Sequence, residues 1–128
     1  MEDRYLFKAK DCNSIWRAGL LIALKEDRCA IEENDGSKWA CDSETLCQCT
    51  GLKDKNGKLI WENDIMVAHL DNAYLENETY IRILWYESGF CSKEKGSEDI
   101  SPIDKFDQEH FEVCGNIFDN PWLLESEE

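Results

Sequence analysis

The sequence has few prolines, few basic residues and no long hydrophobic run. Its longest apolar stretch, residues 19–24, is far shorter than the roughly 20 residues that a membrane-spanning helix needs. The first ten residues mix charges of both signs with aromatic side chains and contain no apolar core of a signal peptide. At 128 residues the chain is long enough for a single domain with its own core, and we expect one domain over residues 1–128 in the cytoplasm.

Motifs for catalysis and cofactor binding are absent as well. The chain has no glycine-rich phosphate loop, no GxSxG and no HExxH. Cys47 and Cys49 supply two thiols, but a zinc site normally has four ligands, and His69, His110 or Cys114 would have to come from elsewhere. Two cysteines that alternate on one strand face explain the same pattern without metal. We therefore predict no enzyme activity, no bound metal and no cofactor.

The seven cysteines do not indicate a disulfide framework, because their number is odd and no secretion signal accompanies them. In a reducing compartment a free cysteine behaves mostly as a small hydrophobic residue. Cys29, Cys91 and Cys114 lie in strand-like stretches, so we expect them in the core or half-buried. All seven are predicted to be reduced thiols.

Basic residues are outnumbered two to one. The chain has 28 acidic and 14 basic residues, a net charge of −14, and an isoelectric point near 4.5. Such a surface repels polyanions, because contacts to phosphates need lysine and arginine, and direct DNA or RNA binding is therefore disfavoured. Two interpretations stay open: the acidity keeps a small protein in solution, or it forms a negative face for a basic partner.

Alternating apolar residues and frequent turn signals predict a mainly β structure. Strands are expected over residues 5–10, 15–24, 28–32, 38–41, 46–50, 59–61, 65–70, 80–86, 90–92 and 111–118, with a short helix near 103–108 and a helical turn at 121–124. Residues 71–79 are expected to form a polar loop. Trp39, Trp61 and Trp85 are predicted in the core, and Trp16 and Trp122 near the surface. Short strands at regular spacing favour a small, bent β-barrel or two packed sheets.

The stretch TGLKDKNGKLIWENDIM, residues 50–66, combines a lysine-rich turn with an apolar run. Asn56-Gly57 suits a hairpin turn in which both central residues have positive φ. The lysines keep this turn in water, and residues 59–61 then enter the core. The polar part reverses the chain and the apolar part belongs to the sheet.

This stretch resembles the signature of the YopX family of phage and prophage proteins. A second block, residues 113–121 followed by Leu123-Leu124, resembles the C-terminal motif of that family, and Arg4 to Lys8 with Trp16 resembles its opening. The family signature blocks thus fall within residues 50–124. One departure is Asn63, where the family usually has glycine; asparagine tolerates left-handed backbone well, so the turn can be kept.

The resemblance implies an SH3-like β-barrel core with an N-terminal β-rich extension and a short C-terminal helical turn. It also implies a phage or prophage origin and no known enzyme activity. We expect the motif residues to be structural: Gly51, Asn56, Gly57, Asp64, Gly115, Asn116, Asn120 and Pro121. Asn120 is expected to cap the last helical turn, with Pro121 as its first residue.

Two functional hypotheses follow. In the first, an accessory protein binds a basic host protein, such as a nucleic-acid-handling or defence protein, as an inhibitor or nucleic-acid mimic. The candidate contact surface is acidic: Glu94, Glu98, Asp99, Asp104, Asp107, Glu109 and Glu112. In the alternative, an outward face with Tyr80, Arg82 and Tyr86 stacks a nucleotide or a single strand. The sequence leaves the identity of the partner and the oligomeric state open.

Overall fold

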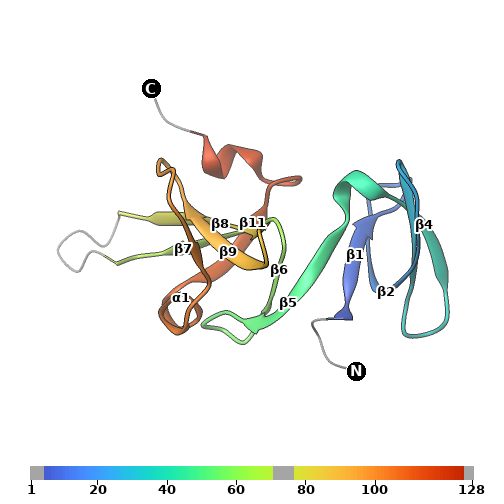
Figure 1. The fold of residues 1–128 in the computed structure, drawn as a ribbon, viewed down its shortest axis with the longest axis horizontal. Coiled ribbons are helices and arrows are strands. Elements are labelled where there is room, and N and C mark those ends of the chain that lie inside the picture. The colour runs from blue at the N-terminus through green and yellow to red at the C-terminus, as the bar shows by residue number, and fades with distance from the viewer. Residues whose placement is uncertain (1–4, 71–76, 126–128) are drawn as a thin grey trace. The chain divides into compact units, whose positions relative to one another are not determined.

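The computed structural model describes residues 5–70 and 77–125 (Figure 1). It is mainly β, as predicted, with two antiparallel sheets that are not closed into a barrel. The expected SH3-like barrel is therefore not confirmed. The sequence predicts one domain, whereas the contacts divide the chain into two compact units, Met1–Gly51 and Leu52–Glu128. Part of the expected 71–79 loop, residues 71–76, lies outside the described residues. No helix in the described part of the chain is long and apolar enough to cross a membrane.

The first unit is an antiparallel sheet with the strand order β4-β3-β2-β1-β5. Its elements are β1 (Phe7–Lys10), β2 (Trp16–Leu24), β3 (Arg28–Glu32), β4 (Lys38–Asp42), the 3-10 helix η2 (Ser43–Thr45) and β5 (Cys47–Lys53). The last residues of β5 belong to the second unit. One face of the sheet is the core, built from Ala9, Cys29, Ile31 and Cys41. Strand β3 alternates between this face and a more exposed one, as the sequence pattern predicted, with Cys29 and Ile31 buried.

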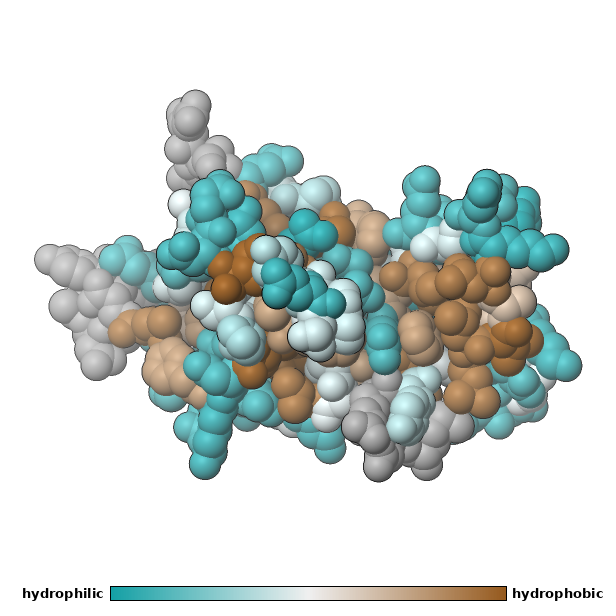
Figure 2. Space-filling model, viewed as in Figure 1, coloured by the Kyte–Doolittle hydropathy of each residue, from teal (hydrophilic) through white to brown (hydrophobic). Residues whose placement is uncertain are grey.

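The exposed residues of β2 include large aliphatic side chains. Leu20, Ile22 and Leu24 expose 38%, 45% and 59% of their surfaces, and in Figure 2 hydrophobic residues gather over the first unit. A register shift between Leu21 and Ala23 interrupts the pairing of β2 with β3. Such a bulge places successive residues outside the regular in-and-out alternation. The long apolar run in the sequence is therefore only partly a core segment.

A carboxylate, a guanidinium and an indole are packed together in the first unit. Asp11 accepts hydrogen bonds from the backbone N–H groups of Asn13 (2.8 Å) and Ile15 (3.1 Å) and from Arg17 Nε (2.9 Å). The Arg17 guanidinium carbon lies 3.5 Å from the ring centroid of Trp39. Asp11 is only 7% exposed. These contacts fix the turn between β1 and β2 against the core of the unit.

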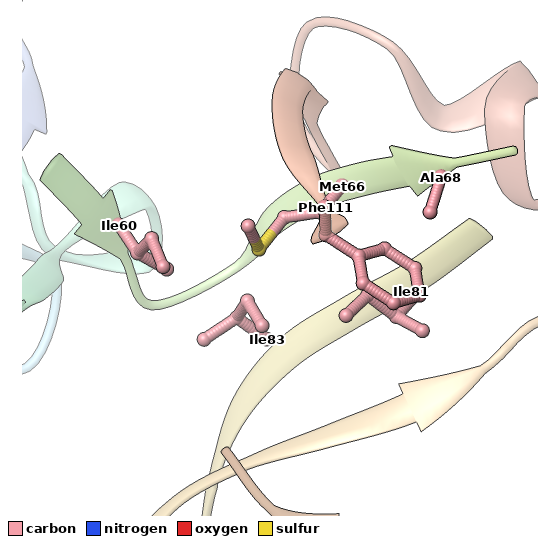
Figure 3. Close-up of a cluster of buried hydrophobic side chains, with 6 residues drawn as sticks. All are labelled: Ile60, Met66, Ala68, Ile81, Ile83 and Phe111. Atoms are coloured by element: carbon pink, nitrogen blue, oxygen red, sulfur yellow. The ribbon is translucent and has the colours of Figure 1, made fainter. Parts of the chain in front are cut away.

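The second unit contains a five-stranded sheet with the order β10-β9-β8-β7-β11. Its elements are β6 (Leu59–Trp61), β7 (Asp64–Ala68), β8 (Thr79–Tyr86), β9 (Gly89–Glu94), β10 (Ile100–Pro102), α1 (Lys105–His110), β11 (Glu112–Asn116) and the 3-10 helix η3 (Pro121–Leu124). Strand β6 is not part of the five-stranded sheet; it pairs with β5. The core side chains converge between these strands, as Figure 3 shows for Ile60, Met66, Ala68, Ile81, Ile83 and Phe111.

Two local predictions need correction. Trp85 was expected in the core but is 49% exposed, because it follows Ile81 and Ile83 on the same strand face beyond the end of the core. Cys114 is exposed, whereas Cys29 and Cys91 are buried as expected. The helix was expected near 103–108 and is found at Lys105–His110.

Candidate partner-binding site

The seven acidic candidates lie in the second unit on β9, the β9–β10 connection, α1 with its N-cap, and β11, and β8 and β7 separate β9 from β11 in the sheet. Glu94 ends β9, Glu98 and Asp99 lie in the connection to β10, and Glu112 begins β11. The other three belong to α1 or its N-cap: Asp104, Asp107 and Glu109. Strands β9 and β10 pair through Ile100 and Lys93, so the hairpin carries its carboxylates at one end of the sheet.

Asp104 and Asp107 form the capping box of α1. Asp104 Oδ1 accepts the backbone N–H of Asp107 at 2.9 Å, and Asp107 Oδ2 accepts that of Asp104 at 3.3 Å. Burial and the nearby Asp104 carboxylate raise the pKa of Asp107 above its ordinary value. These two carboxylates therefore hold the helix start, in addition to any role in binding.

Three further candidates have partners within the unit. Glu98 lies 3.9 Å from Lys93 Nζ, and Glu109 lies 3.8 Å from Lys105 Nζ. Such exposed ion pairs add little to stability and can exchange partners. Glu112 accepts a hydrogen bond from Asn56 Nδ2 at 2.9 Å. Among the described residues no ion pair is found for Glu94 or Asp99, so these two carboxylates are the most available of the set.

The alternative face on β8 is assembled as the alternation predicts, but its members are already engaged. Tyr80 donates its hydroxyl to Glu78 at 2.6 Å, and this hydrogen bond raises the pKa of Tyr80 to about 12. Arg82 is half-buried and donates from Nη2 to Asn63 Oδ1 at 3.1 Å. Tyr86 is 48% exposed. Only Tyr86 presents a largely open aromatic ring.

The 54–58 turn has a different geometry from the one predicted. Gly57 has φ +80°, but Asn56 is not among the residues with positive φ, so the turn is not one with two left-handed centres. Asp54 N–H donates to Lys58 O (2.8 Å) and Gly57 N–H to Asp54 O (3.0 Å). This is a three-residue hairpin loop with glycine in the left-handed position.

The first motif block contains a structural carboxylate that sequence reasoning missed. Asp54 is 6% exposed and accepts the backbone N–H groups of Asn56 and Lys58, each at 2.9 Å, and of Val113 at 2.8 Å. Its oxygens thus join the turn to β11, from the second motif block. The alternation of the strands gives no signal for this contact, which spans 59 residues.

Asn63 has φ 72°, as expected for the residue at the family's glycine position. Its N–H donates to Ile83 O (2.7 Å), and its own carbonyl accepts the N–H of Ile117 (3.1 Å). The side chain adds the hydrogen bond from Arg82, which glycine could not accept. Next to it, Asp64 is 2% exposed and accepts the N–H of Trp61 at 2.8 Å.

The second motif block is a tight turn closed by amide side chains. Asn116 Oδ1 accepts the N–H groups of Phe118 and Asp119, each at 2.9 Å. A Cβ at Gly115 would lie 2.5 Å from Asn120 Oδ1, so a larger residue there would have to displace the Asn120 side chain. Asn120 does stand at the N-cap position before Pro121, but its side chain makes no capping bond and contacts the Asn116 N–H (3.3 Å) instead.

Cys47 and Cys49 are both buried on one face of β5, as the alternation predicted. Within the described residues, no three His, Cys, Asp or Glu side chains are grouped as metal ligands would be.

These features define a protein of two β units. The second unit carries an acidic surface on the β9–β10 hairpin and on α1. The chain belongs to the YopX family: the model of the YopX protein family matches residues 6–125. This match includes residues 71–109, which lie between the two signature blocks. No curated protein matches the chain.

Among solved structures, the chain is similar to protein EF1440 from Enterococcus faecalis, known from a crystal structure. The two are 24% identical, the similarity covers 93% of this chain and 96% of the other, and the TM-score is 0.56. At this identity the likeness supports a shared fold.

Proposed function

We propose that this protein is a non-enzymatic accessory protein of a phage or prophage that binds a basic surface of a host protein. In this proposal it acts in the cytoplasm of an infected or lysogenic bacterium, as an inhibitor or nucleic-acid mimic. The phage or prophage origin is what the resemblance to the YopX family implies, and the membership in that family supports it. The charge distribution supports the mode of binding.

The observation that carries the proposal is the unequal charge of the two units. Residues 1–51 contain 10 acidic and 7 basic residues, a net charge of −3, whereas residues 52–128 contain 18 and 7, a net charge of −11. An acidity that served solubility alone would not need to be concentrated in one unit. A concentrated negative surface attracts basic partners over a distance and speeds their association.

Charge reversal tests the proposal. Asp104, Asp107 and Glu112 are left unchanged because they hold backbone or side-chain hydrogen bonds. The test variant replaces Glu94, Glu98 and Asp99 with lysine. The matched control replaces three exposed acids of the first unit, Glu26, Asp27 and Glu44, with lysine.

Both variants are used as bait in a host lysate, beside the unchanged protein, and the captured proteins are identified by mass spectrometry. We expect the same basic protein with the unchanged bait and with the control, and its loss with the test variant and at high salt. Equal capture by all three baits at low salt would reject the proposal.

A second candidate function, binding of a nucleotide or a single strand, has one local observation in its favour. Arg82 lies opposite Lys93 in the sheet, and Lys95 Nζ lies 5.5 Å from the centroid of Tyr80, so the outer face of β8 and β9 is locally basic. Titration with a fluorescent oligonucleotide at low salt tests it. Binding that Lys93→Ala weakens would support this second function.

A further inference from the structure

The outward face of strands β2, β3 and β4 in the first unit is apolar in its middle. The core of the unit lies on the opposite face of these strands. The register places Ala23 opposite Ala30 and Ala30 opposite Ala40, so one apolar row crosses all three strands. Leu20 and Ile22 add larger side chains on β2, 38% and 45% exposed. A contiguous group of exposed apolar residues, unlike single ones, marks a docking surface.

Four charged side chains frame the alanine row on β3 and β4. Arg28 lies opposite Asp42 on one side of the row, and Glu32 lies opposite Lys38 on the other. The burial pattern of both strands places all four on the outward face. The two positive groups are therefore diagonal to each other, and so are the two negative groups. Within the described part of the chain, neither cross-strand pair forms an ion pair.

This diagonal charge pattern is complementary to a second copy of itself. In a symmetric dimer the same face is used by both subunits, and facing sheets keep their strands roughly aligned. A two-fold axis along the strands brings Arg28 over Asp42 of the partner subunit, and Glu32 over Lys38 of the partner subunit. An axis across the strands brings Arg28 over Glu32 of the partner subunit, and Asp42 over Lys38 of the partner subunit. In both arrangements every charge meets the opposite charge.

We propose that the outward face of β2, β3 and β4 docks a second copy of this chain in a two-fold dimer. The alanine row with Leu20 and Ile22 forms the apolar centre of the interface, and the diagonal charges form its polar rim. The first unit has a net charge of −3 and the second of −11, so two copies repel each other least through the first unit. Because the face is only three strands wide, the dimer is weak and dissociates on dilution.

The inference is independent of the proposed function, because none of these residues belongs to the acidic surface of the second unit. Analytical ultracentrifugation of the full chain tests it at about 0.15 M salt, where long-range repulsion between acidic chains is largely screened. We expect the apparent mass to rise from that of the 14.9 kDa chain toward twice this value as the protein concentration increases to several hundred micromolar.

Two variants with altered rim charges identify the face. Arg28→Glu combined with Lys38→Glu makes all four rim charges negative and should weaken self-association at least about tenfold, since like charges then meet at every position. Glu32→Lys should weaken it less. Mixed together, the two variants should bind each other more tightly than either binds itself, because opposite charges then meet at all rim positions but one. Asp42 is left unchanged because it caps η2.

Two further variants separate charge from apolar contact. Lys55→Glu combined with Lys58→Glu makes the same change of net charge at exposed positions of the second unit and should leave the dimer unchanged. Leu20→Ser combined with Ile22→Ser removes the apolar centre without changing the charge and should weaken the dimer. Melting temperatures show whether each variant is folded.

A monomer at every concentration would reject a second copy as the occupant and leave this face to a different protein. An unaltered dimer in the rim variant would place the interface elsewhere, and equal weakening by the rim variant and the second-unit control would reject the diagonal pattern. Failure of the two mixed rim variants to associate would also overturn the proposal, because a general loss of stability gives monomers but no rescue.

Discussion

A single buried carboxylate, Asp54, joins two segments that lie far apart in the chain. It accepts three backbone N–H groups, one of them from Val113 in β11. Hydrogen bonds to a charged acceptor are stronger than neutral ones, and a buried donor that loses its acceptor is costly. The residue is therefore central to the stability of the second unit.

We predict that Asp54→Ala lowers the free energy of unfolding by about 3 kcal/mol, because three backbone donors lose their acceptor. Urea denaturation followed by circular dichroism measures the change. Lys55→Ala in the same turn is the control and should change stability by less than about 0.5 kcal/mol, since that side chain is exposed. Equal stabilities of the two variants would contradict the role given to Asp54.

Asp11 is the comparable carboxylate of the first unit, because it is buried and accepts two backbone N–H groups. It makes the stability of the protein depend on pH. The hydrogen bond from Arg17, aided by two backbone amides, holds the pKa of Asp11 below its ordinary value. A carboxyl with a lowered pKa in the folded state stabilises the fold above its unfolded pKa of about 3.9 and loses that contribution as pH falls through the folded pKa.

We therefore expect the unchanged protein to be more stable than Asp11→Asn at neutral pH, and this difference to shrink below about pH 4. Urea unfolding of both proteins across that range gives the difference directly. Comparing the two proteins removes the opposite effect of Asp107, whose raised pKa favours the fold at low pH in both. A difference that stays constant from neutral to acid pH would show that Asp11 is not ionised in the fold.

Among the elements, the hairpin turns are where the sequence is most informative. Asn34-Asp35-Gly36 and Lys55-Asn56-Gly57 both form loops in which only the glycine is left-handed, with φ of +88° and +80°. The sequence predicted the place of each turn correctly. It did not predict the type at residues 54–58, because that depends on Asp54, whose third hydrogen bond comes from β11.

We predict that Gly57→Val lowers the free energy of unfolding by about 1–3 kcal/mol, since a β-branched residue is strained at positive φ. A Cβ at Gly57 would have no atom within 4 Å, so the cost is one of backbone conformation and not of a clash. Thermal melting compares this variant with Lys58→Ala, which should melt like the unchanged protein. Unaltered melting of the valine variant would contradict the left-handed turn.

The limits of sequence reasoning at this scale are seen in Trp85 and α1. Trp85 has the same alternation as Ile81 and Ile83, so periodicity places it in the core, although the core ends before it. For α1, the sequence predicts an acidic surface at Asp104 and Asp107, whereas the structure shows that the two residues form the capping box of the helix. Their role as a cap depends on where the helix starts, which composition alone does not determine.

At the scale of the whole molecule, the sequence indicated the β class, the family and the positions of most strands along the chain. It did not indicate the division into two units after Gly51. Domain boundaries usually show as flexible, polar linkers. Here the boundary between the two units, after Gly51, falls inside strand β5, which runs from Cys47 to Lys53. The sequence therefore shows a continuous strand pattern where one unit ends and the next begins.

The thiols give a test of the whole chain. Cys12 and Cys114 are exposed, and the other five cysteines are buried in the two units. Although Cys114 is exposed as a residue, surrounding protein atoms partly desolvate its sulfur and raise the pKa of the thiol, and burial raises the pKa of Cys41 to about 11. Only the thiolate reacts with a disulfide reagent, so reactivity follows both exposure and pKa.

In the folded protein at neutral pH, we expect a thiol reagent such as Ellman's reagent to modify Cys12 first, Cys114 more slowly and the other five only as the protein opens. The Cys12→Ser variant should lack the fast phase and keep the slower ones. Under denaturing, non-reducing conditions all seven thiols should react at once. A denatured count below seven would mean that a disulfide is present, and one zinc per chain by elemental analysis would contradict the prediction that the thiols bind no metal.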